Sequence, residues 1–205
     1  VADVVPLLGL NRAFVVKGLQ VARRRRNPGL AALSAVARLN GPMSPYHLGF
    51  LIGPRINAGG RIGDAALGSR LLATEDPAEA ERIAADLDRL NKERQVMEAA
   101  MVEEADAQVF ARFGADPGAV VVASSAEWHP GVVGLIAARL KEKWGRPALA
   151  VAFDRGPLGT GSARSIPGVD LGAAIRAAVE AGLAPKGGGH KMAAGLTVEE
   201  SRLDE

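Results

Sequence analysis

Apolar residues recur at helical spacing through the first third of the chain. Three segments there are predicted to form helices: 11–26, 30–39 and 64–74. A further helix is predicted to begin at Ser44, because a serine cap followed by proline suits a first turn. The longest periodic stretch runs from residue 76 to about residue 112, with apolar positions three or four residues apart and mostly charged positions between them. This pattern predicts a long helix that connects two domains.

Beyond residue 118 the pattern changes to short apolar runs that alternate with helical stretches. Strands are predicted at 119–123, 147–153 and 193–198, with a further one at 159–165, and helices at 130–144 and 170–180. Such alternation indicates a mixed α/β layer. The predicted fold class is therefore α/β, with a helical part at 1–75, a connecting helix and linker at 76–117, and a small mixed α/β domain at 118–205.

Charge is unevenly distributed along the 205 residues, although the net charge is only +2. Residues 1–75 contain 10 Lys and Arg against 3 Asp and Glu, whereas residues 76–118 contain 5 against 11. Residues 119–198 are basic again, with 9 against 5. Two basic regions around an acidic one favour a polyanionic partner, with solvated charged faces as the simpler alternative.

The composition indicates in which cellular compartment the protein is expected. The chain contains no cysteine, which excludes disulfides and thiolate metal sites and favours a reducing compartment. No apolar run approaches the ~18 residues that a membrane span needs, so we expect a cytoplasmic protein without membrane contact. The sequence opens on V-A-D-V-V-P, with neither an initiator methionine nor a signal peptide. We therefore expect a chain that starts inside a longer protein.

The segment G-P-R-I-N-A-G-G-R at 53–61 is the first candidate site. Arg55 and Arg61 bracket Asn57 and two glycines. Arginine forks match phosphate oxygens in a bidentate manner, and small residues allow a ligand to approach closely. We interpret the segment as a functional loop, with a glycine-rich loop carrying surface arginines as the alternative.

Two further candidates lie in the second domain. Trp128 and His129 precede a predicted helix, whose N-terminus would attract an anion while the indole stacks on a base; a capping or core tryptophan is equally compatible. The segment 159–165 contains Ser162 and Arg164 among small residues, which suits a phosphate cradle.

The run of Gly187, Gly188 and Gly189 followed by His190 is the fourth candidate. Glycine tolerates positive φ and has no side chain, so three in succession can fold into an anion-binding nest of backbone N–H groups. Lysines flank the run, and the histidine adds a ring donor or a stacking face. The alternative is a flexible turn between a helix and a strand.

Five motifs carry a resemblance to a known family: V-A-D-V-V-P-L at the start, G-P-R-I-N-A-G-G-R, W-H-P-G-V-V-G, G-S-A-R-S-I-P-G and G-G-G-H-K-M-A-A-G. In this order they resemble the RecJ family, single-strand-specific 5′→3′ DNA exonucleases of the DHH phosphoesterase superfamily that act in DNA repair and recombination. The resemblance implies that residues 1–75 are the last part of a DHH catalytic domain and that residues 118–198 are a DHH-associated domain that helps to bind the strand.

The resemblance also implies the reaction and its residues. The full-length parent would hydrolyse phosphodiesters with Mn²⁺ or Mg²⁺, and Asp3 matches a metal-binding aspartate. The residues matching loops that bind the strand and its 5′ phosphate are Arg55, Arg61, Ser162 and Arg164. The segment from Gly187 to His190 matches a loop that closes over the active site, with His190 as its catalytic residue.

The chain contains no D-H-H triplet, and Asp3 is the only acid in a metal motif. One carboxylate does not hold two metal ions, so we expect the fragment alone to bind DNA without binding metal or hydrolysing the strand. Single-stranded DNA and replication or repair proteins are the expected partners, and the oligomeric state is left open. Two alternatives remain: a non-catalytic module that binds single-stranded nucleic acid or a replication partner, and a phosphoesterase for small oligonucleotides or nucleoside bisphosphates.

Overall fold

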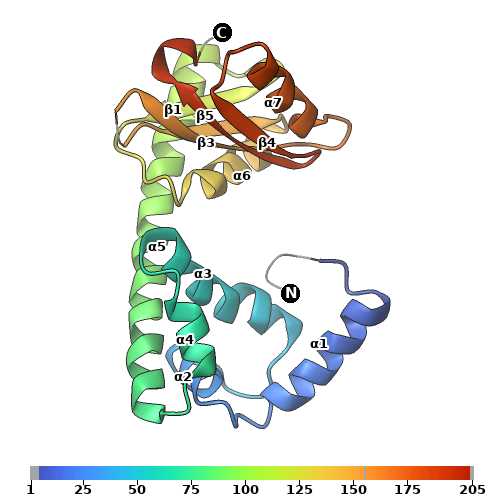
Figure 1. The fold of residues 1–205 in the computed structure, drawn as a ribbon, viewed down its shortest axis with the longest axis vertical. Helices are drawn as coiled ribbons and strands as arrows, with labels where there is room; N and C mark the ends of the chain where they lie inside the picture. The colour runs from blue at the N-terminus through green and yellow to red at the C-terminus, as the bar shows by residue number, and fades with distance from the viewer. Residues whose placement is uncertain (1–4, 155, 204–205) are drawn as a thin grey trace. The chain divides into compact units, whose positions relative to one another are not determined.

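The computed structural model describes residues 5–154 and 156–203. The chain divides into two compact units, Val1–Gln95 and Val96–Glu205, called unit one and unit two below. The long helix α5, Pro77–Phe113, confirms the predicted long helix and contributes to both units (Figure 1). The boundary between the units falls within α5, at Gln95 and Val96.

Unit one is helical. Its elements are α1 (Gly9–Ala22), α2 (Pro28–Val36), the π-helical segment η1 (His47–Ile52), α3 (Gly53–Ile62), α4 (Leu67–Ala73) and the first half of α5. The helices predicted from periodicity are therefore present, with ends shifted by a few residues. The start of α2 is fixed by Asn27, whose side chain accepts a hydrogen bond from the backbone N–H of Leu30, and by the proline in its first turn.

The core of unit one lies between α2, α3, α4 and α5. Leu33, Leu71 and Leu87 are fully buried there. Gly29 makes the close packing of α2 against α4 possible, since a Cβ at this position would lie 2.0 Å from the carbonyl oxygen of Leu71. Helix α1 packs separately, through Leu19 against Met43 and their neighbours.

The four consecutive arginines lie outside the helix that was predicted to contain them. Helix α1 ends at Ala22, and Arg25 has a positive φ of 49°. The side chain of Arg23 donates to the backbone carbonyl of Met43, and that of Arg25 donates to the carbonyl of Leu39. Both carbonyls belong to the loop that follows α2. These bonds hold the loop against the end of α1, so at least two of the arginines have a structural role.

Unit two contains a five-stranded mixed sheet, which confirms the predicted α/β layer. Its strands are β1 (Val121–Ser125), β2 (Ala148–Ala152), β3 (Leu158–Arg164), β4 (Lys186–His190) and β5 (Ala193–Glu199), in the spatial order β1-β2-β3-β5-β4. Strands β1 and β2 are parallel and joined by α6 (Val133–Trp144), and the other neighbours are antiparallel.

The sheet of unit two separates two layers of helix. Helix α7 (Leu171–Glu180) packs on β4 and β5, and α6 packs on β1, β2 and β3. Figure 1 shows the two helices on opposite faces of the sheet. Asp170 caps α7 by accepting from the backbone N–H of Ala173, at the start of the helix predicted over 170–180. Because α6 covers only the first three strands, β4 and β5 have no helix on that face within the described residues.

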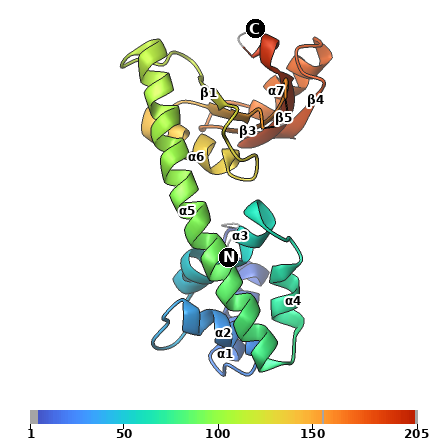
Figure 2. The same cartoon turned by 90° about the vertical axis from the view of Figure 1, so that its left-hand side faces the viewer.

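The second half of α5 is bonded to the sheet of unit two (Figure 2). The side-chain amide of Gln108 donates to the backbone carbonyl of Ser124 at 3.0 Å and accepts from its N–H at 3.2 Å. The indole N–H of Trp144 donates to Asp106. Gln108 thereby pairs with the edge of β1 as a neighbouring strand would.

Among the described residues, no helix combines the length and apolar character that a membrane span requires.

Candidate nucleic-acid interface

Antiparallel pairing places the candidate residues of unit two in rows across β3, β5 and β4. The first row contains Arg164, Ala193 and His190, and the second contains Ser162, Gly195 and Gly188. A third row consists of Thr160, Thr197 and Lys186. Directly opposed residues share one face of a sheet, and so do residues two apart on a strand. All nine therefore lie on one face, called the open face below.

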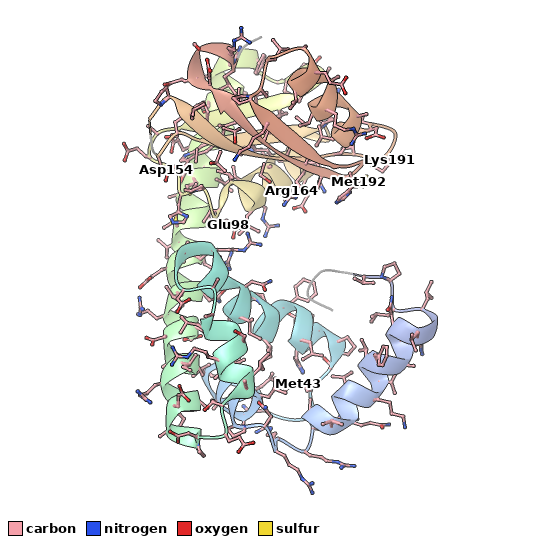
Figure 3. The ribbon with its side chains drawn as sticks, in the orientation of Figure 1. Met43, Glu98, Asp154, Arg164, Lys191 and Met192 are labelled. Carbon is pink, nitrogen blue, oxygen red and sulfur yellow. The ribbon has the colours of Figure 1, made fainter. Side chains whose placement is uncertain are left out.

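Arg164 is the best-defined cation of the open face. Its Nη1 donates to the hydroxyl of Ser162 and to the carbonyl of Ala163, both at 2.9 Å. Burial lowers the pKa of Arg164, but an arginine remains charged under physiological conditions. Since a guanidinium has five N–H donors, these two bonds fix the group in place and leave others for a ligand. Figure 3 labels Arg164 on the side of the sheet where α6 lies.

The N-terminus of α6 lies beside this guanidinium. A Cβ on Gly134 in the first turn would lie 2.9 Å from Nη2 of Arg164 and 3.1 Å from the hydroxyl oxygen of Ser162. The first backbone N–H groups of a helix carry partial positive charge. The end of α6 and Arg164 thus create positive potential at one point of the open face, where an anion is favoured.

His190 lies at the end of the same row as Arg164 and is exposed. Its Nδ1 accepts a hydrogen bond from the backbone N–H of Met192 at 3.2 Å. In the neutral imidazole an accepting Nδ1 leaves the proton on Nε2. The turn therefore orients His190 as a hydrogen-bond donor through Nε2.

The interpretation of residues 187–190 as a loop that forms a nest was wrong, because these residues are strand β4. A Cβ on Gly187 would lie 2.6 Å from Cγ2 of Ile175, and a Cβ on Gly189 would lie 2.3 Å from the carbonyl oxygen of Ala193. These two glycines permit close packing within unit two. Gly188 differs, since a Cβ there would meet nothing within 4 Å. Of the three, Gly188 is the one that leaves space for a ligand.

The strand predicted at 159–165 is confirmed as β3, which lies at the centre of the sheet. Successive side chains of this strand point to opposite faces of the sheet, so the segment does not form a phosphate cradle by itself. Ser162 and Arg164 point to the open face, while Gly161 and Ala163 pack toward Leu196 and the α7 side.

The structure does not support base stacking by Trp128. This side chain is 1% exposed, and its indole N–H donates to Glu104 at 2.7 Å. Of the two alternatives weighed, Trp128 is the core residue. His129 is half-buried, and its Nδ1 accepts from the backbone N–H of Gly131, which shapes the turn before α6. A cavity of about 470 Å³ beside these residues is lined by three carboxylates, which disfavours a phosphate.

In unit one, the segment 53–61 is helix α3 and not the expected loop. Arg55 donates to Asp88 of α5 at 2.8 Å and to the carbonyl of Leu51 at 2.7 Å. Asn57 is exposed, and Arg61 follows it by one turn on the same side of the helix. Gly59 is required by packing, because a Cβ there would lie 2.9 Å from the carbonyl oxygen of Asp64. The helix therefore brings Asn57 and Arg61 together and turns Arg55 toward α5.

The ion pair of Arg55 has a charged neighbour. Lys92 contacts the other carboxylate oxygen of Asp88 at 2.7 Å. Burial by itself raises the pKa of Asp88, but the hydrogen bonds from Lys92 and Arg55 outweigh it, so the pKa lies below its usual value. Asp88 is therefore ionised at neutral pH and holds Arg55 in place, away from a ligand.

No metal ligand set occurs in the described part of the chain. Residues 5–154 and 156–203 contain no group of three or more His, Asp or Glu side chains placed to hold a metal ion. Asp3, the expected metal ligand, lies outside the described residues. The residues described here do not fit a two-metal centre.

Sequence reasoning did not single out five residues of the open face as site residues: Thr160, Lys186, Ala193, Gly195 and Thr197. It also missed Gly134 of α6, which lies beside Arg164. It weighed the two segments 159–165 and 187–190 as separate candidate phosphate sites. The period-two alternation in 160–164 and 193–197 was the available signal, since residues two apart on a strand share a face.

A profile of the DHHA1 domain matches residues 117–205. Over its full length the chain is 40% identical to the single-stranded-DNA-specific exonuclease RecJ of Bacillus subtilis, of which it covers 27%. It is 38% identical to the enzyme of the same description from Escherichia coli, with 99% of this chain and 36% of the relative covered. The chain thus spans roughly a third of the length of these curated relatives.

Solved structures agree with the sequence comparison. The crystal structure of RecJ from Thermus thermophilus in complex with Mg²⁺ matches 98% of this chain and 30% of its own, with a TM-score of 0.85 and 37% identity. A crystal structure of the exonuclease RecJ bound to manganese matches 98% of this chain and 48% of its own, with a TM-score of 0.79 and 38% identity. Along its whole length the chain therefore resembles one segment of the RecJ exonucleases, and residues 117–205 match the DHHA1 domain.

Proposed function

We propose that this chain is the strand-binding part of a metal-dependent, single-strand-specific 5′→3′ DNA exonuclease, and that the open face of unit two holds the DNA. The observation that carries the proposal is the first two rows of that face. They bring Arg164, Ser162 and His190 together beside Gly188 and Gly195. Three donors next to two residues without side chains suit the close approach of a phosphodiester backbone.

Each residue has a separate role in this proposal. Arg164, held by Ser162 and close to the α6 N-terminus, binds one phosphate. His190 donates from Nε2 to an oxygen of the same or the next phosphate, because its Nδ1 is occupied by the N–H of Met192. Gly188 and Gly195 let the sugar–phosphate chain lie directly on the sheet. A contact to the backbone alone carries no base preference, so we expect weak sequence dependence.

The hydrolytic step is not assigned to the described residues. Relatives have been crystallised with Mg²⁺ and with manganese, and a metal pair in such enzymes activates water and stabilises the leaving oxygen. The described residues offer no such ligand set. The 205-residue chain by itself is therefore expected to bind DNA without releasing nucleotides in the presence of Mn²⁺. The proposal places the parent in the cytoplasm, in DNA repair and recombination.

Fluorescence anisotropy with a labelled, 5′-phosphorylated single strand tests the proposal. The wild-type chain is expected to bind the single strand more tightly than the matching duplex. Arg164→Ala is expected to weaken binding roughly ten- to a hundredfold, because a charged hydrogen bond contributes ~1.5–3 kcal/mol and ~1.4 kcal/mol is tenfold.

Arg176→Ala is the matched control. It removes the same charge from α7, on the opposite face of the same sheet, with the loss of one long hydrogen bond to Gly189. Its affinity is expected to stay within about twofold of wild type. Equal affinity of wild type and a well-folded Arg164→Ala chain contradicts the proposal, as does an equal loss in both variants.

A further inference from the structure

The third row of the open face lies beyond the residues used so far. It contains Thr160 of β3, Thr197 of β5 and Lys186 of β4, directly opposite one another. Thr160 and Lys186 are exposed, and Thr197 is half-buried. The structure gives none of the three side chains a hydrogen-bond or ion-pair partner within the described residues. Two hydroxyls and an ammonium group are thus available for a ligand at one place.

The spacing of the rows fits a continuous strand of nucleic acid. Neighbouring rows are two residues apart on antiparallel strands that rise about 3.4 Å per residue, so they lie about 7 Å apart. The row of Arg164 and the row of Lys186 are consequently separated by about 14 Å, which an extended single strand covers in about two nucleotides. The second row lies between them, and at its positions on β5 and β4, Gly195 and Gly188, no side chain blocks the path.

The next row on the same face has the opposite charge. Glu199 of β5 lies beyond Thr197 and pairs with Leu158 of β3. A carboxylate repels a phosphate, so the positive track ends at the row of Lys186. The open face thus has a positive row at Arg164, a row with two glycines, and a second positive row at Lys186. Glu199 lies beyond the last of these rows.

We propose that Lys186, Thr160 and Thr197 form a second phosphate-binding position for the same single strand, about two nucleotides from the phosphate at Arg164. This inference rests on the proposed function. Lys186 binds the phosphate as a point charge at the edge of the sheet, and the two hydroxyls donate from β3 and β5. The position accepts any base, since the groups that line it reach only the backbone.

Binding measured against ligand length tests the second position. The ligands are thymidine 5′-monophosphate and 5′-phosphorylated oligothymidylates of increasing length, titrated into the full chain. Lys186→Ala is expected to leave the affinity for the mononucleotide unchanged and to weaken binding of the longer oligonucleotides about three- to tenfold. It is also expected to reduce the slope of log affinity against log salt by about 0.7, the value for one phosphate of a single strand.

Three variants make the outcome decisive. Thr160→Val together with Thr197→Val keeps volume and charge and is expected to reproduce part of the length-dependent loss. Glu199→Gln is expected to strengthen binding of the long oligonucleotides only. Arg164→Ala is expected to weaken binding at every length, which reports on the first position alone.

The two proposals fail in different ways. If Arg164→Ala leaves binding unchanged at every length, the proposed function fails. If Arg164→Ala weakens binding while Lys186→Ala changes nothing, or lowers affinity equally for the mononucleotide and the longest ligand, the second phosphate position is overturned. Melting curves check that each variant is folded. Because Lys186 and Thr160 are exposed, their substitution is expected to leave the melting temperature nearly unchanged.

Discussion

The three consecutive glycines of β4 have different neighbours, so they are expected to respond differently to substitution. A Cβ on Gly187 meets Ile175 and Leu196, and a Cβ on Gly189 meets the backbone of Ala193. Gly188 has open space on the face that is proposed to bind DNA. One short run therefore serves packing at two positions and ligand access at the third.

Alanine substitutions separate these roles. Gly187→Ala and Gly189→Ala are each expected to lower the free energy of unfolding by ~1–3 kcal/mol, because an added methyl group overpacks the site. Gly188→Ala is expected to change stability by less than ~0.5 kcal/mol and to weaken binding of single-stranded DNA. Thermal melting and anisotropy on the three variants check this. A stable Gly188→Ala chain that binds as well as wild type would show that this glycine does not face the strand.

Asp88 is expected to make the stability of unit one depend on pH. Its pKa is lowered by Lys92 and Arg55 against the effect of burial. A carboxylate with a depressed folded-state pKa adds stability above its unfolded value, about 3.9, and that stability is lost as the pH falls through the folded value. Asp88→Asn is therefore expected to be less stable than wild type at pH 7, and the difference should shrink below about pH 4.

Urea denaturation at several pH values measures this effect. Asp86→Asn is the control, because Asp86 is an exposed acid on the same helix whose nearest ion-pair contact, to Arg89, is 3.8 Å. Its difference from wild type is expected to stay small at every pH. A pH-independent loss in Asp88→Asn would mean that the ion pair is not the source of the stability.

At the scale of elements, Gln108 joins α5 to the free edge of β1. Its amide replaces a neighbouring strand for Ser124, since it bonds both the N–H and the carbonyl. Gln108→Leu is expected to destabilise unit two by ~1–3 kcal/mol, because it leaves two backbone groups without their partner. Hydrogen exchange of the Ser124 amide is expected to accelerate accordingly.

Gln95→Leu is the matched control for this prediction. Gln95 is exposed on the same helix, so its substitution is expected to change stability by less than ~0.5 kcal/mol. Unchanged protection of the Ser124 amide in Gln108→Leu would show that the side chain does not stabilise the edge of β1.

The elements that could be predicted are those with strong periodicity. The long helix, the strands at 121–125 and 148–152, and the cap at Asp170 follow from local pattern. Local sequence predicts loops where helix α3 and strand β4 lie, because glycine and proline disfavour both structures and only packing against neighbouring elements overrides that tendency. Four residues of the open face were found, namely Ser162, Arg164, Gly188 and His190, but their arrangement in rows was not, since the register of a sheet depends on partners distant in sequence.

At the scale of the whole chain, the surface proposed to bind DNA lies in unit two. The described residues provide a positive, partly unobstructed sheet face in unit two and no metal ligand set. In unit one, Arg55 was expected to bind the DNA strand, but it holds α3 to α5. Asn57 and Arg61 are therefore the remaining proposed contacts of α3 to the strand. The open face of unit two is therefore proposed as the principal binding site.

An NMR titration of the 21.2 kDa chain with a 5′-phosphorylated single strand identifies the face of unit two that binds DNA. Amide signals of the open face, those of Ser162, Gly188, His190 and Gly195, are expected to shift together and to saturate at one ligand concentration. Signals of the exposed side of α7, such as that of Ala177, are expected to move little. Shifts confined to α7 or to the arginines at 23–26, with the open face unperturbed, would contradict the account.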